Sequence, residues 1–552
     1  MTSQSLVRLF VGFAIVLSLV CEGIIARYRL HDAHGPVIVS VWSQGKLVAR
    51  AVTDDENAKP PEIEAALEAP DVYRVNEVVT ATSPILTTTE LAFAVSLVTA
   101  RDGVKITYKG QSTYVTPDEL LSQRGYDVGA EADVLGGLQL GADVPLILAL
   151  ASDRLHTPVR ELEDGATFER IRVVRRVPGV IPLPRIDAAM LNRPLVEHAL
   201  MDAARYLARG VNSDGKFRYM VDAATNKTLS GYDWPRHSGA TYFLAQAATL
   251  SHDPQLVGAA LRAAAMLRDR QTVHCGEFDC IGSDDVVDLG SAALAVVAYA
   301  QIAKDIDPSY KAQVERITPF LRRMQREDGE FMHQYDRTKK TPIDIQFPYY
   351  SGEATLALAR AYGVTKDPKD LEAAKKGLAR IVGGSWSFFG DRYYFGEEHW
   401  TCQAMDDLWD AAPDPKALDF CMRWQDYMRA MQLRQGETPH DGDGAYMFDP
   451  VLTPRLTPVA SRCEAGVASL DAARKSHLYS EEEMGAVDGQ LRRALALILR
   501  QQFAPGPTHL FADPEAVRGA IPGSEVDWQI RIDYAQHAGS AMVRWLEVVA
   551  PK

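Results

Sequence analysis

The sequence predicts a mainly helical protein: six helical hairpins closed into an (α/α)6 toroid, preceded by a smaller α+β domain and an N-terminal membrane anchor. Three observations lead to this fold class. Apolar residues recur at helical spacing in twelve successive segments beyond residue 190. Short β-branched runs dominate residues 36–185, and one long apolar run lies near the N-terminus. We therefore expect an anchor at residues 1–30, an α+β domain at 36–185 and the toroid at 190–552.

The composition is that of a large, acidic, folded protein. The 552 residues include 59 Lys and Arg against 73 Asp and Glu, a net charge of −14, with 47% hydrophobic and 24% charged residues. These values exclude a disordered, collagen-like or polytopic membrane protein. An acidic chain without a long basic run is also a poor nucleic-acid binder, because phosphate contacts need clustered Lys and Arg. We therefore expect no nucleic-acid partner.

The apolar run near the N-terminus predicts a membrane anchor. Leu9–Ile25 reads LFVGFAIVLSLVCEGII, close to the ~20 residues that span a bilayer. Arg8 precedes it and Arg27 follows, and the A-x-A pattern of signal-peptide cleavage is absent. We expect an uncleaved signal-anchor that places the rest of the chain on the exported side, periplasmic or extracellular. Cys275 and Cys280, in HCGEFDC, are close enough for a disulfide in an oxidising compartment, with two free thiols as the alternative.

Residues 36–185 are predicted to form the α+β domain. The runs VIVSVW, KLVARAV, FAVSLV, VKITYKG and RIRVVRRV are short, β-branched and bounded by turn residues, which is typical of strands. Within TPDELL, Thr116 is placed to cap a helix that has Pro117 in its first turn. The proline-rich stretch VPGVIPLPRI at 177–186 predicts a linker. A binding or packing role is the default for this domain.

Twelve predicted helices follow the linker and alternate in kind. Each odd helix runs into a loop rich in Gly, Asp and aromatic residues, and each even helix opens with small residues. The predicted helices cover 194–209, 237–250, 255–270, 289–304, 309–325, 351–363, 368–382, 399–411, 415–434, 462–475, 480–502 and 534–549.

The loops and the helix openings repeat each other in sequence. NSDGKFRYMVD, CGEFDC, REDGEFMHQYD and DGDGAYMFD each contain a Gly followed within two residues by an aromatic, which predicts a tight turn that buries a ring. RHSGATY, DLGSAAL, YSGEATL, RCEAGVA and QHAGSAM open even helices with small residues, which allow helix ends to crowd together. Self-similarity at a period of roughly 45–70 residues indicates a repeat architecture, too uneven for an open solenoid. A closed toroid with the even helices inside is expected.

This layout resembles the six-hairpin glycosidase-like superfamily of toroids, which includes the D-glucuronyl C5-epimerase C-terminal type. The resemblance covers about two thirds of the chain and rests on the helix layout and on phrases such as QREDGEF and YYSGEATLALARAY. It implies that the even helices form an inner barrel, that their N-termini surround one mouth, and that the substrate is a polysaccharide or other glycan. It identifies neither the exact family nor the reaction, and lanthionine synthetases, prenyltransferases and terpene cyclases share the toroid.

Residues at the start of each even helix are expected to line that mouth. Carboxylates and imidazoles can transfer protons, aromatic faces stack on sugars, and Arg forks hold carboxylates. The candidate catalytic residues are Glu353, Glu398, His237, His399 and Asp288. The candidate substrate-binding residues are Trp234, Arg236, Tyr349, Tyr350, Trp400, Arg462, Glu464, Tyr534 and His537. The helix dipole alone explains many of the acids at these positions.

Glycoside hydrolysis is the first chemistry that fits these residues. It needs two carboxyl groups about 5–5.5 Å apart for retention or ~6.5–9.5 Å apart for inversion. Glu353, in YYSGEAT, and Glu398, in GEEHWTCQ, are the favoured pair. Asp288, in VVDLGS, is interpreted as a helix cap first and as a catalytic base second.

Proton abstraction next to a uronate carboxylate is the second chemistry. His237 and His399 would be the bases of such a lyase or epimerase, and Tyr349 or Tyr350 the acid. Arg236 would clamp the carboxylate. For each histidine, a structural hydrogen bond at a crowded helix start is the alternative.

We therefore expect a carbohydrate-active protein of the cell envelope that hydrolyses or modifies a polysaccharide, without metal or cofactor. A non-catalytic scaffold that binds a glycan or peptide is the alternative. A zinc enzyme of the lanthionine-synthetase kind is less well supported, since C-x-x-C and H-E-x-x-H are absent. DGDG at 441–444 lacks the rest of a calcium loop. The zinc-enzyme alternative would draw its ligands from scattered residues: His274, Cys275, His399, Cys402, Cys463 and His537.

Overall fold

The chain forms two compact units. A computed structural model describes residues 29–126, 141–181, 184–383, 398–436, 441–446, 453–503 and 509–550. Unit 1 comprises Met1–Leu183, Asp449–Thr453 and Gly506–Asp513; unit 2 comprises Pro184–Phe448, Pro454–Pro505 and Pro514–Lys552. The predicted anchor run, Leu9–Ile25, lies outside the described residues. No helix within those ranges is long and apolar enough to cross a membrane.

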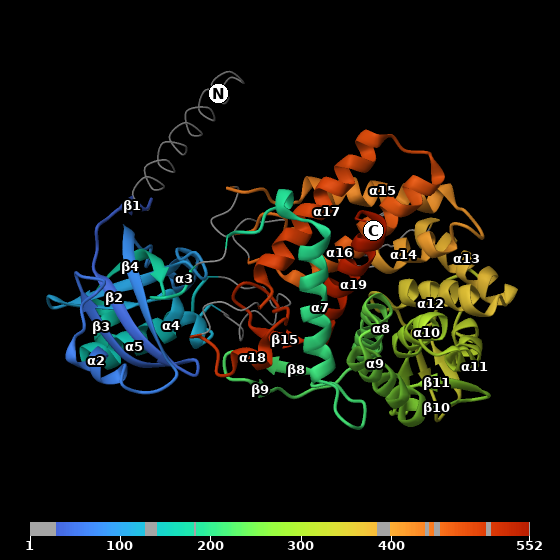
Figure 1. Ribbon diagram of the computed structural model, residues 1–552, viewed down its shortest axis with the longest axis horizontal. Helices are drawn as coiled ribbons and strands as arrows, with labels where there is room; N and C mark the ends of the chain where they lie inside the picture. The colour runs from blue at the N-terminus through green and yellow to red at the C-terminus, as the bar shows by residue number, and fades with distance from the viewer. Residues whose placement is uncertain are drawn as a thin grey trace, which may run out of the picture. The chain divides into compact units, whose positions relative to one another are not determined.

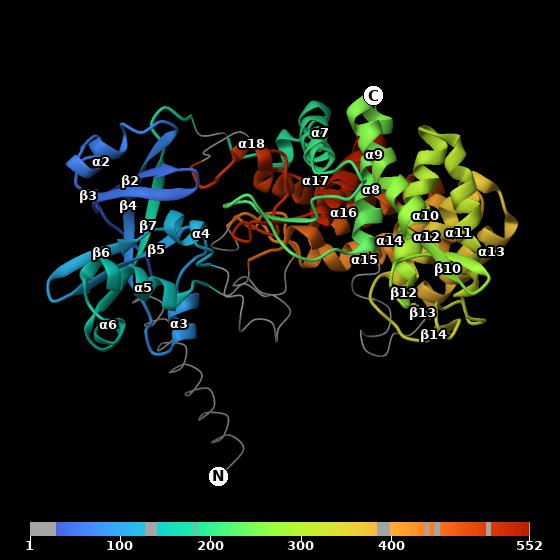
Figure 2. The ribbon, with the colours of Figure 1, turned by 90° about the horizontal axis from the view of Figure 1, so that it is seen from below.

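Unit 1 is built on an antiparallel sheet with strand order β3-β2-β4-β7-β5-β6, and β1 pairs with β4 (Figures 1 and 2). The strand β2 is buried on both faces, which explains why VIVSVW is almost continuously apolar. On one face Val39 packs with Ile63 of α2, and on the other Ile38 packs with Val79 and Ile171. The strands are β1 (His31–Asp32), β2 (Val37–Ser43), β3 (Lys46–Thr53), β4 (Val72–Pro84), β5 (Asp102–Tyr108), β6 (Gln111–Val115) and β7 (Thr167–Arg176).

Five short helices complete the described part of unit 1: α2 (Pro61–Ala66), α3 (Glu90–Val95), α4 (Pro117–Ser122), α5 (Val144–Leu155) and α6 (Val159–Gly165). The predicted start of α4 is confirmed, with Thr116 and Glu119 forming a capping box. The predicted strand FAVSLV is wrong. Its first residues lie in α3, because the Thr89 side chain accepts a hydrogen bond from the Ala92 N–H and starts a helix there.

Unit 2 consists mainly of two layers of helices, and all twelve predicted helices are confirmed within the described ranges. The outer helices are α7 (Arg193–Arg209), α9 (Pro254–Met266), α11 (Lys311–Arg323), α13 (Pro368–Gly383), α15 (Pro415–Ala430) and α17 (Glu481–Gln501). The inner helices are α8 (Trp234–Ser251), α10 (Leu289–Asp305), α12 (Tyr350–Thr365), α14 (Glu398–Leu408), α16 (Leu456–Ser476) and α19 (Ile532–Val548). A short helix α18 (Pro514–Val517) precedes the last of them.

The inner helices form a closed ring. Each packs against the next one along the chain, and α19 packs against α8. Each also packs against an outer helix; in Figure 2, α10 and α12 lie side by side with α11 and α13 beyond them. The inner helices are buried over most of their circumference, as α10 is from Leu289 to Ala300. This is the predicted toroid with the even helices inside.

The glycine loops repeat one geometry at equivalent positions. Gly215, Gly329 and Gly444 have φ of +88°, +93° and +98°, a region that favours glycine. A Cβ on these residues would lie 2.2, 2.5 and 2.1 Å from a carbonyl oxygen of the next outer helix. The aromatic two residues later pairs with a residue two positions beyond the preceding outer helix, as Phe217 does with Val211 and Phe331 with Gln325. The predicted tight turns are confirmed at these three loops.

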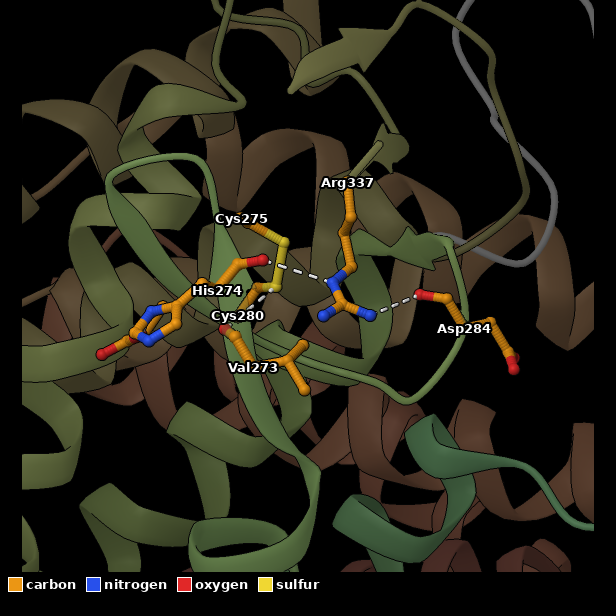
Figure 3. The surroundings of a disulfide bond; sticks show 7 residues. Val273, His274, Cys275, Cys280, Asp284 and Arg337 are labelled. Atoms are coloured by element: carbon orange, nitrogen blue, oxygen red, sulfur yellow. Dashed lines mark hydrogen bonds and ion pairs between the residues drawn. A yellow bond between two sulfur atoms is a disulfide. The ribbon is translucent and has the colours of Figure 1, made fainter. Parts of the chain in front are cut away.

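The fourth glycine loop is closed by a disulfide instead. Cys275 and Cys280 are bonded, as predicted, and join β10 (Thr272–Cys275) to β11 (Phe278–Ile281). Figure 3 shows Arg337 beside the bond, donating hydrogen bonds to the carbonyl oxygens of His274 (3.2 Å) and Asp284 (3.0 Å). The remaining small strands of the loops are β8 (Met220–Asp222), β9 (Lys227–Thr228), β12 (Val286–Asp288), β13 (Gln334–Asp336), β14 (Thr341–Ile343) and β15 (Gln529–Arg531).

The seam between α19 and α8 leaves no room for a side chain at Gly539, where a Cβ would lie 2.0 Å from Phe243 Cζ. Gly539→Ala is expected to lower the free energy of unfolding by about 1–3 kcal/mol through overpacking. The matched control is Gly485→Ala on the exposed face of α17, where a Cβ meets nothing within 4 Å. The Gly485→Ala change is expected to raise the free energy of unfolding by ~0.5–1 kcal/mol, because Ala has the higher helix propensity. Denaturant unfolding measures both, and a neutral or stabilising Gly539→Ala would contradict a tight seam.

Candidate functional site

Within the described part of the chain, three proton-transfer side chains from three consecutive inner helices come together. His399 is in the first turn of α14, Glu464 lies on α16 and His537 near the start of α19. One ligand atom from each of the three lies within 4.8 Å of the other two. We call these three residues the His–Glu cluster. His399 and Glu464 are buried, and the His537 side chain keeps 12% of its surface exposed.

A short hydrogen bond orients one imidazole of the cluster. His537 Nδ1 lies 2.7 Å from Glu464 Oε2. Because an ionised carboxylate only accepts hydrogen bonds, Nδ1 carries the proton and Nε2 is the basic nitrogen. The ring centroids of His537 and His399 lie 5.3 Å apart at 71°, so the two imidazoles meet edge to face. Two imidazoles and a buried carboxylate are thus brought together by the ring of helices.

Aromatic rings surround the two imidazoles. The Trp400 ring lies 4.5 Å from His399 and 5.7 Å from His537. The Tyr349 ring lies 6.1 Å from His399 and is 44% exposed. Tyr349 precedes α12 with φ of +82°, a conformation that bulky residues rarely adopt and that is often found at functional sites. Tyr349 is therefore suited to stack against a sugar ring beside the imidazoles, whereas Trp400 is buried and packs against them.

A chain of ion pairs occupies the starts of α8 and α19. Arg236 is ion-paired with Asp233, and its Nε lies 3.4 Å from Asp533 Oδ2. Arg531 holds Asp533 with two hydrogen bonds of 2.6 and 2.8 Å. Burial opposes ionisation of Asp533, yet the Arg531 hydrogen bonds prevail and lower the pKa of that carboxyl. Arg236 is therefore already engaged by two aspartates.

A third group joins the starts of α10 and α12. Asp288 caps α10 by accepting a hydrogen bond of 2.7 Å from the Ser291 N–H, as the sequence predicts. Burial raises the pKa of Asp288, and it also raises the pKa of Tyr350. Gly290 allows both neighbours on α12 to approach, since a Cβ there would lie 2.5 Å from the Tyr350 ring and 2.6 Å from Glu353 Oε2.

His237 is not part of the His–Glu cluster. It is fully buried, with its Nε2–H donating to the Ala263 carbonyl (3.0 Å) and its Nδ1 accepting from the Tyr232 hydroxyl (2.7 Å). Burial lowers its pKa to about 4. Both ring nitrogens of His237 have hydrogen-bond partners in the protein. This histidine therefore has the structural role given above as the alternative to a catalytic base.

The other candidate binding residues lie as follows. The Trp234 ring packs against Tyr232, at 5.0 Å between centroids. Arg462 is buried and reaches Met428 of α15, with 2.9 Å between Nε and sulfur, so it faces the outer layer. The Tyr534 ring lies 4.8 Å below the Arg531 guanidinium. The side chain of Glu398 lies outside the described residues, so the pair with Glu353 stays a prediction.

A polar cavity of about 960 Å³ lies at the opposite, C-terminal ends of the inner helices. Its floor is a buried ion-pair network. Arg544 of α19 pairs with Asp406 of α14, Lys475 of α16 lies 3.1 Å from Asp406, and Arg360 of α12 lies 2.8 Å from Asp407. Burial raises the pKa of Asp406 to about 7. Sequence reasoning misses this network, although the i+7 spacing from His399 to Asp406 and from His537 to Arg544 is a usable signal.

The described cysteines do not supply the zinc ligands that the sequence left open. Cys275 is bonded to Cys280, and Cys402 to Cys421. Burial raises the pKa of the Cys463 thiol, which disfavours a thiolate. The DGDG segment is likewise engaged, since Asp441 pairs with Arg185 (2.7 Å) and Arg500 (2.9 Å). Among the described residues, metal binding would have to use histidine and carboxylate.

No family model and no curated protein matches this chain. Solved structures are similar to it. One is a D-mannose isomerase, with 14% identity and a TM-score of 0.47 over 66% of this chain and 99% of that one. Another is cellobiose 2-epimerase from Bacillus thermoamylovorans B4167, with 12% identity and a TM-score of 0.48 over 64% and 98%. A third is an unsaturated glucuronyl hydrolase specific for heparin, with 13% identity and a TM-score of 0.46 over 65% and 98%.

The arrangement of six inner and six outer helices that the sequence predicts is present in the described residues of unit 2. At these identities the likeness concerns the fold alone. The reaction has to be argued from the residues of this chain.

The buried His237 makes stability depend on pH. Its folded pKa of about 4 lies below the unfolded value of 6.5, so the unfolded state binds the extra proton between these limits. The stability it contributes is present above pH 6.5 and is lost as the pH falls through 4, by roughly 3 kcal/mol in total. His237→Gln, which keeps one donor and one acceptor, should flatten this part of the profile. Unfolding free energies from pH 7 to 4 test this, and an unchanged slope in the variant would contradict it.

Proposed function

We propose that the toroid is a carbohydrate-modifying enzyme that transfers a proton at a carbon next to a sugar carbonyl, as an isomerase or epimerase does. The observation that supports this best is the His–Glu cluster. It offers two facing imidazoles, one of them oriented by the 2.7 Å hydrogen bond from Nδ1 to Glu464. A base and an acid on two sides of one carbon are what such a reaction needs.

In the proposed step His537 Nε2 removes the proton, and the C–H electron pair moves toward the carbonyl to give an enediol. Glu464 stabilises the imidazolium that forms, because it holds the Nδ1–H. His399, on the other side, protonates the carbonyl oxygen or returns a proton to carbon. Return to the neighbouring carbon gives the isomer, and return to the opposite face gives the epimer. No oxidant or cofactor is required.

A neutral sugar is a better substrate than a uronate. Arg236 and Arg531 are already paired with Asp533, and Arg455 Nη2 lies 2.9 Å from Asp527 Oδ2. A substrate carboxylate would have to displace an aspartate from one of these arginines. Sugar hydroxyl groups can instead hydrogen-bond to these arginines and aspartates without breaking the ion pairs.

Hydrolysis of a glycan remains the second candidate. It is favoured by the group around Gly290, where Asp288 has a raised pKa and Glu353 is buried. A carboxyl group with a raised pKa is suited to protonate a leaving oxygen. Release of reducing ends from a polysaccharide, without exchange of carbon-bound hydrogen, would support this candidate over proton transfer.

The cell envelope is the proposed location, with a glycan substrate there. Two disulfides favour an oxidising compartment, and the apolar run Leu9–Ile25 favours an anchored, exported chain. A non-catalytic scaffold is the remaining alternative, and the next experiment separates it from an enzyme.

Proton transfer predicts incorporation of solvent deuterium into a sugar. Purified protein is incubated in D₂O with glucose, mannose, fructose and cellobiose, and deuterium at C1 and C2 is followed by NMR. Replacing His537 by Asn should reduce the exchange rate by about 10²–10⁴-fold, because a general base is lost. Glu464→Gln should reduce it less and shift the pH profile, since Glu464 acts through His537.

The matched control is His198→Gln, on an outer helix, where the side chain is 67% exposed. It should leave the rate unchanged. Binding of the sugars without any exchange would support the scaffold instead. Exchange that survives the His537 substitution would contradict the proposed base.

A further inference from the structure

The His–Glu cluster has the donor set of a metal site. We propose that His399, Glu464 and His537 bind one divalent first-row transition cation, such as Zn²⁺ or Co²⁺, and that this cation inhibits the reaction by occupying the proton-transfer groups. Metal binding stands on the geometry alone. The inhibition rests on the proposed function.

The ligand atoms are close enough for one cation. They lie within 4.8 Å of each other, and bonds of about 2.0–2.2 Å require separations of at most ~4.4 Å. A small rotation of one side chain closes the difference. The second carboxylate oxygen, Glu464 Oε1, is buried and has no hydrogen-bond partner among the described residues. Such an atom is suited to accept a cation, because an unsatisfied buried oxygen is otherwise costly.

The donor set also selects the kind of metal. Two imidazoles and one carboxylate suit zinc, cobalt, nickel or iron, whereas Ca²⁺ and Mg²⁺ prefer oxygen ligands throughout. The positive ends of the inner helices oppose a cation at this mouth. The Glu464 carboxylate offsets them as a direct ligand, and Asp533 is close enough to interact electrostatically with His537. The two bonds to imidazole nitrogen then favour a transition cation over Ca²⁺ or Mg²⁺.

Binding and catalysis exclude each other. The cation takes the place of the proton between His537 Nδ1 and Glu464, and the neutral imidazole then carries its proton on Nε2, the nitrogen that would otherwise act as the base. His399 supplies the third bond. In this state neither imidazole can accept a proton from a sugar carbon. The tryptophan beside them, Trp400, would also change its surroundings, which gives a fluorescence signal.

The test uses untagged full-length protein freed of metal with chelator, and Co²⁺ and Zn²⁺ as their chlorides. Calorimetry should give one site, and Co²⁺ should show the visible absorption of a low-symmetry nitrogen and oxygen site. Glu464→Gln and His399→Gln should each weaken binding by at least about tenfold. The control is His274→Gln, which removes an exposed imidazole–carboxylate pair, 2.8 Å from His274 Nδ1 to Asp279 Oδ1, and should not change affinity.

Inhibition by the metal is measured in a separate experiment. In the deuterium-exchange assay, Zn²⁺ should inhibit with a constant equal to its dissociation constant, and chelator should restore the rate. Equal affinity in wild type and Glu464→Gln overturns the site. Tight binding without inhibition, or activation by the metal, overturns the inhibitory role. If the protein exchanges no sugar hydrogen at all, the proposed function fails, while calorimetry and the Co²⁺ spectrum still decide whether the metal site exists.

Discussion

Closure of the inner ring, where α19 packs against α8, is the contact on which the rest of the toroid depends. Two glycines from the two helices face large side chains across this seam. Gly539 lies against Phe243, and Gly239 lies against Gln536. In this ring α14 packs against α16 and α16 against α19, which brings residues distant in sequence into one cluster. His399, Glu464 and His537 meet for that reason, and no local sequence motif connects them.

Polar residues occupy two levels of the same helices. The His–Glu cluster lies near the N-terminal ends, and the Asp406–Arg544 pair lies two turns further along α14 and α19. Removing one partner of such a buried pair leaves an uncompensated charge, so the network holds the helices in a fixed register. Fixed helices keep the two imidazoles 5.3 Å apart before any substrate arrives. Preorganisation of this kind is what proton transfer between two side chains requires.

The fold was largely predictable because helical periodicity and repeated loop phrases survive in the sequence. Gly215 and Gly329 mark the same turn in different hairpins, and both were visible as Gly-x-Phe. The strand predicted at FAVSLV fails because β-branched composition there competes with a good cap at Thr89. The sequence predicts which residues gather at the mouth, but not which of them contact each other. The sequence places Glu464 and His537 at the mouth, but their hydrogen bond depends on the packing of α16 against α19. Burial of both ring nitrogens distinguishes His237 from His537.

The proposed function depends on sugar chemistry at the imidazoles of His399 and His537. A crystal structure with a linear polyol such as mannitol or sorbitol, which resembles an open-chain sugar, tests it most directly. C1 and C2 of the polyol should lie against the two rings, with a nitrogen of each imidazole within hydrogen-bond reach of their hydroxyl groups. A polyol held by Asp288 and Glu353, with both imidazoles out of reach, would contradict it.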